Sequence, residues 1–193
     1  MSYTLVSLDP ITNEVQSELP GLAPDHLCAV CLSSVNRFLE NARVWRYDTT
    51  PELTGAVVNF VAPTGATVIG YRDLKWTEGV NHGRTTFKTN QPDEITLDPI
   101  PDTFTVGDLE VTLLLKVAEG RDEIPDFILN THKEVMRSTT MARLMLEPSK
   151  PYSNPELGLL YAQESQRRTS EARDMAERMY GNNESRWTFP RWA

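Results

Sequence analysis

Two cysteines three residues apart are the first candidates for chemistry in this chain. Cys28 and Cys31 have the C-x-x-C spacing used for zinc binding and for thiol redox reactions. A zinc site needs a second Cys or His pair, whereas His26, His82 and His132 are scattered along the sequence. Both cysteines also lie on the apolar stripe of a predicted helix, where a free thiol packs as a small hydrophobe. We therefore predict two buried core thiols in a protein of a reducing compartment, without a metal site.

No other spacing of side chains predicts catalysis. His82 lies in Val80-Asn81-His82-Gly83, which reads most simply as a turn because Asn and Gly favour turns. A small hydrolase built around His82 is a further, weaker alternative. The acidic residues do not form a spaced pair for acid–base work. The chain also lacks a phosphate-binding glycine loop, a nucleophile elbow and a metal-binding His-Glu helix motif. We expect no enzyme activity and no cofactor.

The C-terminal tail is the segment most suited to binding. Two of the four tryptophans fall within the last seven residues, interspersed with arginines. Trp and Arg are enriched in interface hot spots, and extended peptides with such anchors dock on partner proteins. The candidate docking residues are Arg186, Trp187, Phe189, Pro190, Arg191 and Trp192. Packing of this tail against its own domain is the alternative.

Formal charge divides the chain into three unequal blocks. Residues 1–47 carry three basic and five acidic groups, a net charge of −2. Residues 48–126 carry six basic and fourteen acidic groups, a net charge of −8, and residues 127–193 carry ten and eight, a net charge of +2. The total of −8 argues against general affinity for nucleic acids or anionic membranes. The split indicates two surfaces with different neighbours, or alternatively one solvated acidic face.

Neither a membrane span nor a secretory signal is predicted. No apolar run reaches the length of a transmembrane helix. Residues 1–20 lack the basic start and the apolar centre of a signal peptide.

Apolar residues at three- and four-residue spacing predict three helices. The first begins at Pro24 or Asp25 and fades near Trp45. It follows an irregular N-terminal arm over residues 1–23, in which Met1–Ser7 is a candidate short edge strand. The second runs from Ile124 to the proline at 148. Its predicted apolar side consists of Phe127, Ile128, Val135, Ala142, Met145 and Leu146. The third runs from Pro155 to about residue 180, with the preceding asparagine as its N-cap.

Between residues 48 and 123 the apolar period changes to two and turn residues multiply. The predicted strands are Ala56–Val61, Thr67–Tyr71, Thr85–Thr89, Glu94–Leu97, Thr103–Val106 and Leu109–Val117. The expected fold class is therefore α+β. An N-terminal helix and a C-terminal helical hairpin form a helical core over residues 24–47 and 124–181. An acidic antiparallel sheet or barrel is inserted at 48–123, and a docking tail occupies 182–193.

The last predicted helix has a thin apolar stripe between two charged flanks. The stripe consists of Leu157, Leu160, Tyr161, Ala172, Met175, Ala176 and Met179. Opposite charges at i,i+4 spacing stabilise such a helix by about 0.2–0.5 kcal/mol per pair. This pattern suits a helix standing beside copies of itself in a ring, or alternatively an outer helix of a monomer. The candidate inter-subunit residues are Glu164, Arg167, Arg168, Glu171, Arg173, Asp174, Glu177 and Arg178.

The order of helix, β insertion, two helices and aromatic tail resembles the head-to-tail adaptors of short-tailed phages, of the tail tubular protein A type. The likeness is closest over residues 120–181. There an acidic approach, Asp122–Ile128, opens a helix that carries Ala142-Arg143. A proline loop then leads to a helix with Glu164, Glu171-Ala172-Arg173 and Met179-Tyr180-Gly181. The rest of the chain is similar only in architecture.

The resemblance implies a structural role without enzyme activity or cofactor. Such adaptors form a dodecameric ring between the portal protein and the tail nozzle protein, around a channel for genomic DNA. The implied location is the neck of the virion tail, after assembly in the host cytoplasm, with the C-terminal segment reaching into the portal. The candidate lumen- or tail-facing acidic residues are Asp93, Glu94, Asp102 and Asp108. An acidic lumen would let the DNA polyanion slide without sticking. The competing hypothesis is a monomeric module that docks one partner through its tail.

Overall fold

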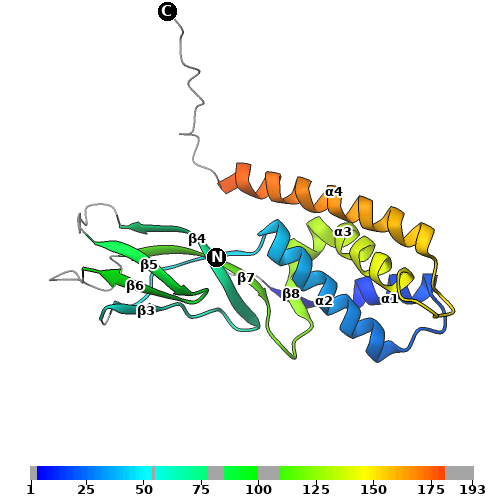
Figure 1. Cartoon of the computed structure of the whole chain (residues 1–193). Coiled ribbons are helices and arrows are strands. Elements are labelled where there is room, and N and C mark those ends of the chain that lie inside the picture. The colour runs from blue at the N-terminus through cyan, green and yellow to red at the C-terminus, as the bar shows by residue number, and fades with distance from the viewer. Residues whose placement is uncertain (1–3, 54, 78–84, 100–108, 181–193) are drawn as a thin grey trace, which may run out of the picture.

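The computed structural model describes residues 4–53, 55–77, 85–99 and 109–180. Four helices and antiparallel sheets in the described part of the chain confirm the predicted α+β class, with 46% of the described residues helical and 27% in strands. Figure 1 shows an elongated molecule with two ends. The helices gather into a helical body at one end, and most strands form a β module at the other.

The N-terminal region contains more regular secondary structure than its prolines and glycine (Pro10, Pro20 and Gly21) predict. Strand β1 (Leu5–Ser7) pairs antiparallel with β8 (Glu123–Pro125), and helix α1 (Asp9–Glu18) follows it. Strand β1 lies within the candidate edge strand Met1–Ser7, whereas the expectation of an irregular arm is wrong over α1. Proline is tolerated in the first turn of a helix, because its missing N–H has no partner there. Ile11 and Val15, one helical turn apart, are both fully buried and hold α1 on the body.

Three longer helices complete the helical body: α2 (Pro24–Ala42), α3 (Asp126–Met145) and α4 (Pro155–Tyr180). Helix α3 packs against the other three helices. It begins two residues later than expected, because Ile124 and Pro125 belong to β8. Its predicted apolar side is correct for Ile128, Val135, Ala142 and Met145, which are buried. It is wrong for Phe127 and Leu146, which are more than 40% exposed because they lie at the helix ends, where fewer neighbours cover them.

The start of α4 agrees with the sequence. The backbone N–H of Leu157 donates to Asn154 Oδ1 at 3.2 Å, the N-cap bond predicted for the residue before Pro155. The stripe is only partly buried: Ala172 and Ala176 are in the core. Its larger members Leu157, Leu160 and Met175 are 37%, 62% and 52% exposed, a correction to the predicted packing face. Partly buried Tyr161 also packs against the core, and the small residues Ala172 and Ala176 let α4 lie close to it.

The β module consists of two three-stranded antiparallel sheets in the described part of the chain. One has the order β2-β7-β4, and the other has the order β3-β6-β5. The strands are β2 (Arg46–Thr49), β3 (Val57–Asn59), β4 (Ala66–Trp76), β5 (Thr86–Gln91), β6 (Glu94–Asp98) and β7 (Leu109–Val117). Aromatic pairs join the sheets, with ring centroids 5.9 Å apart for Phe60–Tyr71 and 5.3 Å for Trp76–Phe87. The predicted strand Thr103–Val106 lies outside the described residues, and β2 was not predicted.

The helical body and the β module are joined through α2 and β7. The side chain of Asn36 accepts a hydrogen bond from the Val117 N–H at 2.9 Å and donates to its carbonyl at 3.3 Å. Lys116 forms an ion pair with Glu40 at 2.7 Å. Trp45, between α2 and β2, is 0% exposed, and its carbonyl accepts the Leu115 N–H at 3.0 Å. This packing couples the orientation of the module to that of the body.

Replacement of Gly158 by valine is expected to loosen the contact between α4 and the end of α3. A Cβ atom at this position would lie 2.9 Å from Leu146 Cγ and 3.2 Å from Met145 Cβ. Overpacking of this kind costs about 1–3 kcal/mol, measurable as a lower urea midpoint. Gln163→Val, at an exposed site of α4, is the matched control for β-branching. Equal losses in the two variants would contradict a tight contact at Gly158.

Across the described residues, no helix combines the length and the apolar composition that crossing a membrane requires.

Candidate functional site

Several predicted site residues lie outside the described residues. These are the docking tail (Arg186, Trp187, Phe189, Pro190, Arg191 and Trp192), the acidic residues Asp102 and Asp108, and His82. Their proposed roles stay predictions. Asp93 and Glu94 are described and lie at the turn between β5 and β6, where Asp93 is exposed.

The cysteine pair is divided between the core and the surface. Cys31 is 1% exposed, and burial raises the pKa of its thiol to about 11. Cys28 is exposed, so the prediction of two buried thiols is wrong for it. Three residues rotate a helix by about 300°, so the two side chains point about 60° apart and only one faces the core. A thiol with a raised pKa is a poor nucleophile and metal ligand at neutral pH. Within the described ranges, no group of three or more His, Cys, Asp or Glu side chains is placed to hold a metal ion.

The charged flanks of α4 are paired within the helix. Glu164 contacts Arg168 at 2.5 Å and Arg167 at 2.9 Å. A hydrogen bond from Arg167, which makes the larger contribution, and one from Arg168 lower the pKa of the Glu164 carboxyl to about 2. The predicted pairs Arg167–Glu171 and Arg173–Glu177 are also formed, at 2.5 and 3.2 Å. Asp174 and Arg178 are exposed, and they do not form an ion pair with each other in the described part of the chain.

The first turns of α4 present apolar side chains to water. Leu159 is exposed beside Leu157 and Leu160. Leu146, half-exposed at the end of α3, lies against Gly158 in the same region. Sequence reasoning missed Leu159, because it falls outside the predicted stripe. A count of leucines in the first two turns, independent of periodicity, would have found it.

A basic groove runs between α2 and α4, with α3 as its floor. Its volume is about 510 Å³. It contains Arg37 from α2, Arg143 from α3 and Arg173 from α4, and no acidic residue lines it. We call this surface the α2–α4 groove; its remaining lining residues are Phe38, Asn41, Thr139, Ala142, Leu146, Ala162, Ser165, Gln166, Thr169 and Ser170. Sequence reasoning missed Arg37 and Arg143, because they lie on helices distant in sequence.

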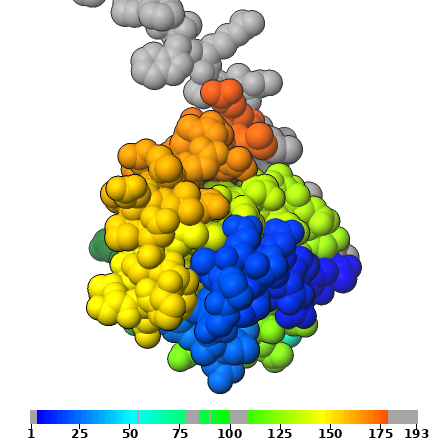
Figure 2. Space-filling model, turned by 90° about the vertical axis from the view of Figure 1, so that its right-hand side faces the viewer, coloured from blue at the N-terminus to red at the C-terminus, as the bar shows by residue number. Residues whose placement is uncertain are grey.

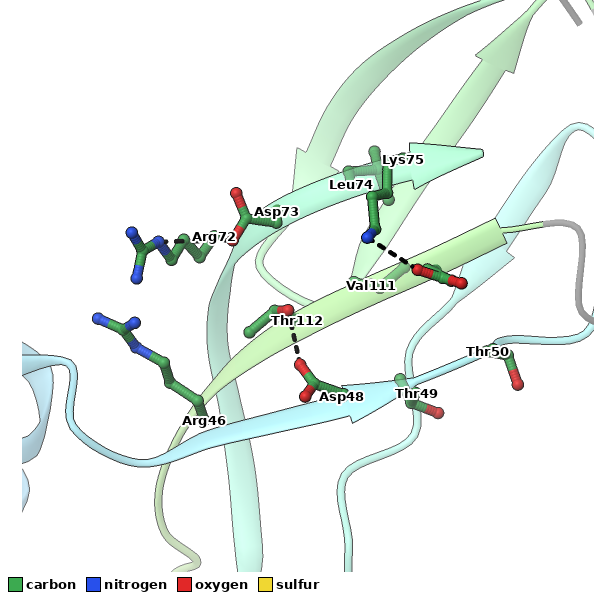
Figure 3. A pocket seen from close by; sticks show the side chains of 11 residues that line it. Arg46, Asp48, Thr49, Thr50, Arg72, Asp73, Leu74, Lys75, Val111 and Thr112 are labelled. Carbon is green, nitrogen blue, oxygen red and sulfur yellow. Dashed lines mark hydrogen bonds and ion pairs between the residues drawn. The ribbon is translucent and has the colours of Figure 1, made fainter. Parts of the chain in front are cut away.

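A hollow of about 670 Å³ lies on the outer face of the β2-β7-β4 sheet (Figure 3). Arg46, Arg72 and Lys75 line it together with an equal number of carboxylates. The charges compensate one another locally: Lys75 contacts Glu110 at 3.0 Å, and Arg72 contacts Asp73 at 3.4 Å. Hydrogen bonding to Glu110 and its charge raise the pKa of Lys75. Internally paired charges make this a polar sheet surface rather than an acid–base site.

A hydrogen-bonded cluster fastens the α3–α4 loop to the start of α2. Glu147 contacts His26 Nε2 at 2.8 Å and accepts a hydrogen bond from the Tyr152 hydroxyl at 2.7 Å. Burial and this hydrogen bond raise the pKa of Tyr152 from 10.0 to about 12. Because the folded-state pKa exceeds the unfolded value, the bond stabilises the fold fully below pH 10 and less as pH approaches 12.

The Tyr152→Phe variant is therefore expected to be less stable than the parent chain by about 1 kcal/mol at neutral pH. The difference should shrink as the pH rises from 10 towards 12. Urea midpoints across this range provide the measurement. Tyr47→Phe, a partly buried tyrosine of β2, is the control. A constant difference between Tyr152→Phe and the parent would contradict the linkage.

No protein-family model matches this chain, and no curated protein sequence matches it.

Proposed function

We propose that this chain is a structural head-to-tail adaptor of a short-tailed phage. Twelve copies would form a ring between the portal protein and the tail nozzle protein and leave a channel for DNA. The observation that carries the proposal is the surface of α4. This helix of 26 residues is roughly 39 Å long and extends along the helical body. Part of its apolar stripe remains uncovered in the single chain.

Burial of this surface between copies would stabilise a ring. Complete burial of one leucine or methionine side chain contributes about 1.5–3 kcal/mol. Leu157, Leu160 and Met175 are already partly covered, so each would contribute a fraction of that amount. Repetition of a modest contact around a closed ring adds up to a stable assembly. The charged flanks of α4, paired within the helix, would surround this contact as a polar rim.

The two-ended architecture suits a connector. The contacts of Asn36 and Trp45 couple the helical body to the β module, so that a ring of bodies would hold a ring of modules. The sequence block that supplies the module also carries the excess of acidic groups. Asp93 and Glu94, at the β5–β6 turn, would then face the lumen or the tail and repel passing DNA.

The docking tail would provide the contact with the portal. Helix α4 ends at Tyr180, and residues 181–193 follow it directly. Thirteen residues can extend by at most roughly 43–47 Å, which is enough to reach a separate ring.

The native mass of the 21.8 kDa chain, alone and with the portal ring from the same source, tests the proposal. We expect a discrete complex with one adaptor per portal subunit. A free ring of twelve copies would have a mass of about 260 kDa, twelve times that of the chain. A chain that remains monomeric and does not bind the portal would contradict the proposal and favour a module that docks a different partner.

A further inference from the structure

We propose that an acidic turn of one copy binds in the α2–α4 groove of the next copy. The acidic turn is Ala118–Asp122, which connects β7 to β8. This inference rests on the proposed ring and assigns the two surfaces that would meet in it. Different surfaces on the two partners make a heterologous contact, which closes into a ring when the rotation between copies allows.

The groove has the charge and the shape of a receptor for an anionic protruding segment. Arg143 Nη1 donates to Ser33 Oγ at 2.7 Å, and Arg173 Nε donates to Glu177 at 3.2 Å. Neither bond uses all five N–H groups of its guanidinium. Among the described residues, Arg37 and Arg143 have no carboxylate partner. Small side chains such as Ser165 leave room between the helices for a turn to enter.

The hydroxyl groups that line the groove already have hydrogen-bond partners within the chain and are not the binding groups. The hydroxyls of Thr139 and Ser165 contact each other at 2.6 Å. Thr169 donates to the carbonyl of Ser165 at 2.7 Å, and Ser170 donates to the carbonyl of Gln166 at 3.2 Å. A ligand of this groove would therefore be recognised by the arginines along its length, and carboxylates are their best complement.

The acidic turn is exposed and pre-organised. The Arg121 N–H donates to the Ala118 carbonyl at 3.2 Å, and Gly120 has a φ of +74°, which favours glycine. The Asp122 carbonyl accepts the Leu8 N–H at 3.0 Å, which anchors the turn to the helical body. Glu119 and Asp122 are both exposed, and neither forms an ion pair within the described residues. From 119 to 126 the sequence has four acidic residues and one basic residue.

The two surfaces lie on different sides of the molecule. In Figure 1 the β7–β8 turn projects at the lower edge, whereas α4 runs along the upper edge. Figure 2, turned by 90°, again places α4 at the top of the body. A chain cannot insert its own turn into its own groove in this arrangement. The same two surfaces can be satisfied between neighbours that repeat around an axis.

Charge reversal on one surface at a time tests this contact. The turn variant carries Glu119→Lys and Asp122→Lys, and the groove variant carries Arg37→Glu and Arg173→Glu. Like charges facing each other cost several kcal/mol, so either variant should raise the concentration needed for ring formation by about 100-fold or more. The control variant, Glu52→Lys with Asp73→Lys, changes as much charge on exposed residues of the β module. It should assemble as the parent chain does.

An equimolar mixture of the turn variant and the groove variant is the decisive measurement. In an alternating ring, each unaltered turn meets an unaltered groove, and each lysine turn meets a glutamate groove. Native mass should therefore show rings in the mixture and not in either variant alone, with or without the portal. Rescue also demonstrates that both variants fold.

The outcomes that would overturn the inference are distinguishable from one another. If the parent chain forms no ring, even with the portal, both the proposed function and the inference are contradicted. If both charge-reversal variants still form rings, or if their equimolar mixture stays unassembled, the inference is overturned and the proposed function is unaffected. Loss of binding to duplex DNA in the groove variant only, with assembly unchanged, would instead assign the groove to nucleic acid.

Discussion

Trp45→Ala is expected to lower the free energy of unfolding by about 3–5 kcal/mol, the usual loss for a large aromatic side chain removed from a core. Trp45 is the largest fully buried side chain of the described residues. It lies where α2 passes into β2, and its carbonyl accepts the Leu115 N–H from β7 at 3.0 Å. A cavity at this point would weaken both parts of the molecule and their connection. Urea unfolding followed by circular dichroism measures the loss.

Trp76→Ala is the matched control for this substitution. Trp76 is only partly buried in β4, where its ring packs against Phe87 with the centroids 5.3 Å apart. Its removal is expected to cost about 1–2 kcal/mol. Equal losses at the two tryptophans would contradict the role of Trp45 as the central residue of the junction.

Deletion of residues 184–193 is expected to reduce affinity for the portal ring by about 100-fold or more. Truncation of a hot-spot side chain costs about 2 kcal/mol or more, and the tail carries Trp187 and Trp192 among its anchors. Assembly of the adaptor with itself should persist, because the surfaces assigned to the ring lie in the helices and the β7–β8 turn. Co-migration of the two rings in native gels or by native mass checks both statements.

Two substitution variants separate the anchors from the length of the tail. Trp187→Ala with Trp192→Ala should reproduce most of the loss caused by deletion. Ser185→Ala with Thr188→Ala, in the same segment, should leave portal binding unchanged. A deletion variant that still binds the portal would show that the tail is not the docking element.

Sequence reasoning succeeded where a local signal was strong. Asn154-Pro155 predicted the first residue of α4, because an N-cap side chain and a proline act within one helical turn. Alternation over Leu109–Val117 predicted β7, whose odd-numbered residues are buried. It failed for α1, where two prolines and a glycine suggested loops. Only two apolar residues of that helix, Ile11 and Val15, are fully buried, too few for a periodic pattern.

The candidate surfaces were predictable only in part. The charged residues of α4 were visible as i,i+4 pairs, because they interact within one helix. The α2–α4 groove was not visible, since Arg37 and Arg143 are more than a hundred positions apart in the sequence. The burial of Cys28 was mispredicted for a related reason. Apolar periodicity identifies the buried side of a helix but not how wide the covered face is.

The sequence by itself determined the α+β class, the start of α4 and the strand β7, because these depend on interactions between near neighbours. It also carries the charge division and the aromatic tail on which the proposed portal contact rests. Tertiary structure decided which apolar residues of α4 stay in water and which arginines share a groove. It also decided how α2 and β7 join the two ends of the molecule. Those features arise from contacts between segments far apart in the chain, where burial depends on the geometry of every neighbour at once.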